Sequence, residues 1–139
     1  MTNISLAQSY LKKVLDRIDV LDLLFRKEAY SDVVREAQEL VELAVKGMLR
    51  QAGIEPPKHH DVGAMLTEHR DRFQNISGET IERIAAISKA LRKERELSFY
   101  GDIDFIPTEE YTAEHAQDAM QGANFVAEAA RAVIKVDDS

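Results

Sequence analysis

The 139-residue chain contains no cysteine. A disulfide framework, a thiolate metal site and a cysteine nucleophile are therefore excluded, and a reducing, cytoplasmic location is expected. No apolar run approaches the roughly 20 residues that a helix needs to cross a bilayer, so we expect no membrane association. The first residues, MTNISLAQSYLKK, do not have the layout of a signal peptide and are already amphipathic.

Proline and aromatic residues are also scarce, with three prolines and 6% aromatic residues in the chain. Alanine, leucine, glutamate and arginine are common, which favours helix over strand. Apolar residues make up 45% of the chain, enough for one domain to bury a substantial core. The formal net charge of −7 opposes non-specific binding to nucleic acid, so any such contact requires a local basic patch.

Apolar residues recur at helical spacing in five segments, namely 5–26, 31–52, 60–73, 78–99 and 112–135. Short connections between long amphipathic helices favour antiparallel neighbours. The sequence therefore predicts an all-α fold, an up-and-down four-helix bundle with one additional short helix. All of it lies in a single domain, 1–139, whose core spans about 5–135.

The first segment has a wider apolar stripe than a surface helix needs. Such a helix requires an apolar face of only about 100°, whereas Leu11, Leu15 and Ile18 widen this stripe towards half the circumference. The surplus predicts contact either with two neighbouring helices or with a second subunit.

Several residues are typical of helix ends. Ser31 and Asp61 are expected to act as N-caps, and Thr108 and Thr112 compete to cap the last helix. Gly53 stands where a glycine commonly ends a helix, and the two prolines that follow prevent continuation.

The end of the fourth segment, LRKERELSFYGD at 91–102, carries the strongest local signal. At 100° per residue, Arg95 falls in the middle of the apolar face, with Ser98 beside it and Arg92 on its edge. A guanidinium aimed at a core is costly unless it is paired or opens into a cleft.

Two interpretations of this arginine stay open. In the first, Arg95 is a structural residue paired with a carboxylate on a facing helix, for which Glu36 is one candidate. In the second, Arg92, Arg95, Ser98 and Tyr100 line a cleft that binds a phosphate-bearing ligand. Arginine presents a planar fork that suits phosphate, and tyrosine offers a stacking face and a hydroxyl.

Metal and cofactor sites are not expected. His59 and His60 are adjacent and would point about 100° apart on a helix, and His69 and His115 are distant in sequence. No His-x3-His or Glu-x2-His pair lies on one helical face, which is the spacing that metal sites in bundles use. His60 is expected either to help cap the short helix or to pack beneath the loop with the two prolines. The chain has no glycine-rich phosphate loop and no nucleophile elbow.

The chain resembles small prokaryotic HEPN domains (higher eukaryotes and prokaryotes nucleotide-binding). The resemblance rests on YSDVVREAQELVELAVKGMLRQAGIEPPKHHDVGAML and on LRKERELSFYGD followed by TEEYTAEHAQDAMQGANFV, and it covers about 5–135. It implies a four- or five-helix up-and-down bundle that is usually a homodimer. It also implies kinship with the members that are encoded beside a minimal nucleotidyltransferase and form a complex with it, often as a toxin–antitoxin pair.

Many members of that family are metal-independent ribonucleases with an Arg-x(4–6)-His motif at this helix end. Here Arg95 matches the arginine, but Tyr100 stands where the histidine is expected, and no such motif occurs in the chain. A tyrosine with a pKa of about 10 is a poor base near neutral pH. We therefore favour a non-catalytic, homodimeric module that binds a nucleotidyltransferase partner, a nucleotide or RNA. The alternatives are a divergent ribonuclease toxin and a purely structural or regulatory bundle.

Overall fold

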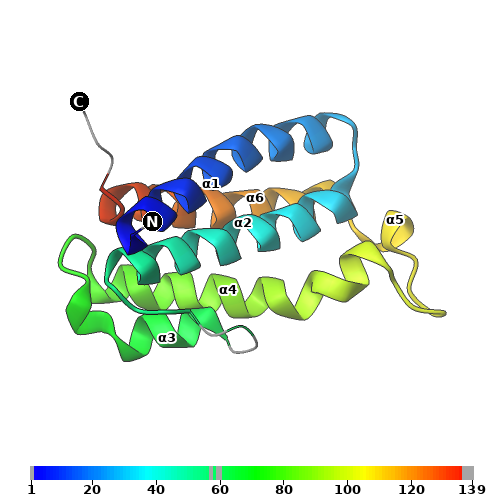
Figure 1. Ribbon diagram of the computed structural model, residues 1–139. Coiled ribbons are helices and arrows are strands. Elements are labelled where there is room, and N and C mark those ends of the chain that lie inside the picture. Colours follow the sequence, from blue (N-terminus) through cyan, green and yellow to red (C-terminus); the bar gives the residue numbers. More distant parts are fainter. Residues whose placement is uncertain (1, 57, 59–60, 136–139) are drawn as a thin grey trace.

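The computed structural model describes residues 2–56, 58 and 61–135. Four long helices form an up-and-down bundle, as expected for this all-α chain (Figure 1). They are α1 (Asn3–Arg26), α2 (Tyr30–Gln51), α4 (Gly78–Phe99) and α6 (Ala113–Val133). The short elements are α3 (Val62–Glu68), η1 (Arg70–Arg72) and α5 (Pro107–Glu110). Among the described residues, the sole β-type pairing is an isolated bridge between Asp102 and Phe105.

Helix α2 lies at the centre of the bundle and packs against α1, α4 and α6. Its apolar side chains are fully buried, including Leu40, Met48 and Leu49. The short helix α3 lies against α4 and α2, whereas α5 and the α1–α2 connection lie at the opposite end of the bundle (Figure 1). Because α2 touches all three other long helices, it fixes the positions of the side chains that the sequence singled out on α4.

The wide stripe of α1 has a simple explanation within one chain. Helix α1 packs against both α2 and α6. Leu11 is buried, and Leu15 and Ile18 pack against the core from its edge. The prediction of two neighbouring helices is therefore confirmed, and these residues do not by themselves require a second subunit.

Most of the expected helix-end residues act as such. Gly53 has a φ of +79°, in the left-handed region that favours glycine, directly after the end of α2. The Asp61 carboxylate accepts a hydrogen bond from the backbone N–H of Gly63, at 3.0 Å, and so caps α3. Thr112 caps α6 in a capping box with His115, and Thr108 lies inside α5 instead.

The N-cap expected at Ser31 is wrong. Helix α2 begins one residue earlier, at Tyr30, with Ala29 as its N-cap, and Ser31 is buried in the first turn. The chain reverses between α1 and α2 through Glu28, which has a φ of +60° without being glycine. The Ala29 carbonyl then accepts the first helical hydrogen bond, from the N–H of Val33.

Two further boundaries differ from expectation. The short middle helix is shorter than 60–73, because α3 ends at Glu68 and a 3-10 turn follows it. His60 and the role expected for it lie outside the described residues. The loop expected at 102–107 is present over 102–106 and ends one residue early, because α5 begins at Pro107, a first helical position where proline is favoured. No helix in the described part of the chain is long and apolar enough to cross a membrane.

Candidate functional site

Arg95 lies in the last two turns of α4 and is not buried. Its side chain is 51% exposed, with one guanidinium nitrogen 3.3 Å from a carboxylate oxygen of Glu39 and the other 4.0 Å from Glu42. The long side chain runs from the edge of the core towards solvent, as arginine commonly does. The helical wheel placed Arg95 on the core-facing side of α4, but its side chain is half exposed and does not enter the core.

The carboxylate partner expected on a facing helix is present, but at a different residue. Glu39 and Glu42 of α2 pair with Arg95, whereas Glu36 pairs with Arg17 of α1 at 3.2 Å. Glu39 is also 3.9 Å from Arg35, so it is shared between two cations. Arg95 therefore belongs to a partly exposed charge network that links α4 to α2.

The other three predicted site residues lie in different surroundings. Arg92 is 3.9 Å from the Asp61 carboxylate at the start of α3. Ser98 is fully buried and donates its hydroxyl hydrogen bond to the backbone carbonyl of Arg95, at 3.1 Å. Tyr100, just beyond α4, is 77% exposed, and its ring packs edge-on against Phe99. The four side chains thus point to four environments, and phosphate binding through them stays a prediction.

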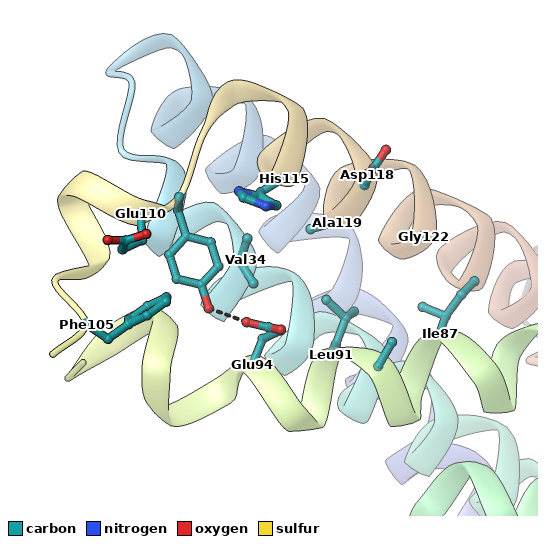
Figure 2. Close-up of a pocket in the computed structure, with 12 residues that line it drawn as sticks. Val34, Ile87, Leu91, Glu94, Phe105, Glu110, His115, Asp118, Ala119 and Gly122 are labelled. Carbon is teal, nitrogen blue, oxygen red and sulfur yellow. Dashed lines mark hydrogen bonds between the residues drawn. The ribbon is translucent and has the colours of Figure 1, made fainter. Parts of the chain in front are cut away.

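A cavity of about 460 Å³ lies beside these residues, between α4 and α6, and sequence reasoning missed it (Figure 2). Val34 of α2 forms part of its wall, and Phe105 and Tyr111 stand at the end next to α5. None of the four predicted site residues lines it. Its lining residues are Val34, Ile87, Ala90, Leu91, Glu94, Phe105, Glu110, Tyr111, His115, Asp118, Ala119 and Gly122.

Small side chains account for the space. Ala119 and Gly122 of α6 and Ala90 of α4 are among its lining residues. At Gly122, an added Cβ would lie 3.1 Å from Ile87, so the glycine lets the two helices approach beside the opening. Small residues on neighbouring helices also allow close helix packing, so their pattern alone cannot separate a tight contact from a cavity.

The principal polar contact inside the cavity joins Glu94 and Tyr111. The Tyr111 hydroxyl donates a hydrogen bond to the Glu94 carboxylate (Figure 2). Burial, this hydrogen bond and the nearby negative charge together raise the pKa of Tyr111 well above its ordinary value. The phenol therefore stays protonated and acts as a donor.

The histidine at the cavity edge has a structural task. His115 Nδ1 accepts a hydrogen bond from the backbone N–H of Thr112 at 3.0 Å, which completes the capping box. Its ring also packs edge-on against Tyr111. Among the described residues, no group of three or more histidine, aspartate or glutamate side chains is arranged to hold a metal ion.

The fold and these sites define an all-helical bundle with a charged α4 end and a neighbouring apolar cavity. A family model for the HEPN domain matches residues 7–133, so the chain belongs to the HEPN family. The crystal structure of ST0689, an archaeal HEPN homologue, superposes with a TM-score of 0.68 at 21% sequence identity. That match covers 93% of this chain and 98% of the homologue, and it supports the fold alone. A comparison with curated proteins finds no match.

Proposed function

We propose that this HEPN-domain protein is a non-catalytic binding module that acts as a homodimer and associates with a partner of the nucleotidyltransferase type. The observation that carries this proposal is the distribution of exposed apolar side chains. Of the seven large apolar residues that are exposed in the described part of the chain, six lie in the last two turns of α1 or between the end of α4 and the start of α5, at the end of the bundle that holds α5 and the α1–α2 connection (Figure 1). They are Val20, Leu23, Phe99, Tyr100, Ile103 and Ile106, with exposed fractions from 40% to 91%. We call this set the apolar end.

Exposed apolar and aromatic residues grouped in this way are typical of protein–protein contacts. Tyr100 and Ile103 are the most exposed of the set, at 77% and 91%. The absence of the family's histidine supports a role without catalysis, because Tyr100 occupies that position and is a poor proton acceptor at neutral pH. The kinship with nucleotidyltransferase-associated members supplies the type of partner.

The oligomeric state of the purified protein tests the homodimer. Sedimentation at micromolar concentration is expected to give a dimer for the wild type and a monomer for the double variant Tyr100→Ser, Ile103→Ser. Ile4→Ser is the matched control, because Ile4 is also exposed but lies at the start of α1. A monomeric wild type would contradict the homodimer. Titration with a minimal nucleotidyltransferase from the same organism tests the second partner, and no complex would contradict that part.

Binding of nucleotide or RNA is a second candidate, favoured by the partial exposure of Arg92 and Arg95, at 35% and 51%. Glu39 and Glu42 beside Arg95 weaken its attraction for phosphate. Fluorescence anisotropy with a labelled single-stranded RNA is therefore expected to show little binding. Binding that Arg95→Ala abolishes would favour this candidate over the protein partner. Cleavage of the RNA by pure protein would refute the non-catalytic role and favour the divergent ribonuclease.

A further inference from the structure

The cavity between α4 and α6 plays no part in the proposed association through the apolar end. Its volume of about 460 Å³ lies within the range of about 300–1,000 Å³ that small-molecule sites occupy. Apolar residues, among them Val34, Ile87 and Leu91, form most of its wall, and five of its twelve lining residues carry polar groups. This combination is typical of a site for an organic molecule with an apolar body.

The charges at the cavity have one sign. Glu94, Glu110 and Asp118 are the charged residues of the lining, and no described lining residue is a lysine or an arginine. A phosphate-bearing ligand would face three carboxylates there. A positively charged group would instead be attracted to them, most strongly where the cavity excludes water.

Glu94 is the carboxylate best placed to receive a cation. It lines the cavity one helical turn after Leu91, and its carboxylate is hydrogen-bonded to Tyr111 (Figure 2). The Tyr111 hydroxyl occupies its Oε2, and no described group makes a hydrogen bond to Oε1. None of the ion pairs among the described residues involves Glu94. This partly buried carboxylate therefore lacks an ion-pair partner of opposite charge among these residues, whereas Arg95, the next residue, pairs with two carboxylates of α2.

Aromatic rings stand beside the same carboxylate. Phe105 and Tyr111 pack edge to face with their centroids 5.7 Å apart, and Tyr111 and His115 do so at 5.6 Å. Ring faces attract ammonium groups, more strongly where water is excluded. The rings would also cover the apolar part of a ligand whose charge lies at Glu94.

We propose that this cavity binds a small organic cation, a molecule with an apolar body and an ammonium group. The ammonium group donates a hydrogen bond to Glu94 Oε1 and the apolar body lies between α4 and α6, against Leu91 and Ala119. Tyr111 holds the carboxylate in place through Oε2. This site is independent of the association proposed above, so either can fail while the other stands.

Three probes of one shape but different charge test the proposal. Calorimetric titration of the wild type is expected to show binding of phenethylamine, a cation at neutral pH. Phenethyl alcohol, which is neutral, and hydrocinnamate, an anion, are expected to bind about tenfold more weakly or not at all, as the loss of one charged hydrogen bond predicts. Equal binding of the three probes, or no binding of the amine at millimolar concentration, would overturn the proposal.

Two variants locate the site. Glu94→Gln is expected to weaken amine binding about tenfold, whereas Glu128→Gln is expected to leave it unchanged. Glu128 is exposed on α6, outside the cavity lining, and its substitution changes the net charge equally. Ala119→Leu, which fills the cavity with an apolar side chain, is expected to abolish binding. Unchanged binding in Glu94→Gln, or equal weakening in the Glu128 control, would overturn the assignment of Glu94.

Discussion

Replacement of Arg95 by alanine tests whether this arginine is a structural residue or an available one. A pair of unit charges about 4 Å apart near a protein surface has a Coulomb energy of about 4 kcal/mol. The Arg95 side chain is 51% exposed, however, and water screens most of that energy. Measured exposed pairs contribute only about 0.2–1 kcal/mol. Because Arg95 pairs with two carboxylates, its contribution should lie near the upper end of this range, and Arg95→Ala should lower the free energy of unfolding by about 1 kcal/mol.

The partners that Arg95 leaves behind keep this cost small. Glu39 retains Arg35 at 3.9 Å, and Glu42 retains the hydrogen bond from the Gln38 amide at 2.9 Å. Glu39 therefore keeps a cation nearby and Glu42 keeps a hydrogen-bond donor. For a domain of this size, a loss of about 1 kcal/mol corresponds to a fall in Tm of about 3 °C.

Urea unfolding followed by circular dichroism measures this change. Lys12→Ala is the matched control, because Lys12 pairs with Asp16 on the outside of α1 and both side chains are more than 60% exposed. This substitution should leave the free energy of unfolding almost unchanged. A loss above about 3 kcal/mol in Arg95→Ala, the cost of breaking a buried pair, would refute the reasoning. Arg95 would then be a structural residue, and its candidacy as a ligand contact would end.

Three further predictions follow from the helix ends and the Tyr111 phenol. Thr112→Ala removes the cap of α6 and should lower the free energy of unfolding by about 1 kcal/mol in urea titration. Gly101→Ala should cost about 1–3 kcal/mol, more than Gly53→Ala. Both glycines have positive φ, but a Cβ at Gly101 would lie 2.6 Å from the Phe105 carbonyl, whereas at Gly53 the nearest atom is 3.8 Å away. The raised pKa of Tyr111 means that the folded state keeps a proton that the unfolded state releases, so stability should fall as pH rises above about 10, and Tyr111→Phe should weaken that dependence in urea titrations across the alkaline range.

The helices were predictable because their signals are local. Regular apolar spacing placed α4 at 78–99, which are its bounds in the structure, and Asp61 was expected as a cap from its side chain. For the last helix the sequence offered Thr108 and Thr112, and the structure selects Thr112. The start of α2 was not predictable in this way. Its turn depends on Glu28 in a left-handed conformation, and no glycine or asparagine marks that position.

The site was less predictable because its contacts are not local. The Glu94–Tyr111 hydrogen bond joins residues 17 positions apart, across a loop whose path no sequence pattern specifies. The cavity is space between α4 and α6 that side chains do not fill, and the spacing of apolar residues in the sequence does not indicate such space. In the same way, a helical wheel gives the direction of Arg95 but not how far its side chain extends towards solvent.

Neighbouring residues on α4 thus have opposite electrostatic surroundings. On an ideal helix Glu94 and Arg95 flank Leu91 on opposite sides, by about 60° and 40°. Arg95 faces α2, where Glu39 and Glu42 neutralise it. Glu94 faces α6, where the described lining offers alanine, glycine, carboxylates and a phenol but no lysine or arginine. The positive charge of Arg95 therefore has partners of opposite charge within the chain, whereas the negative charge of Glu94 has none among the described residues. For a small molecule that binds through its charge, the Glu94 face beside α6 is therefore a stronger candidate site than the Arg95 face, to which the sequence pointed.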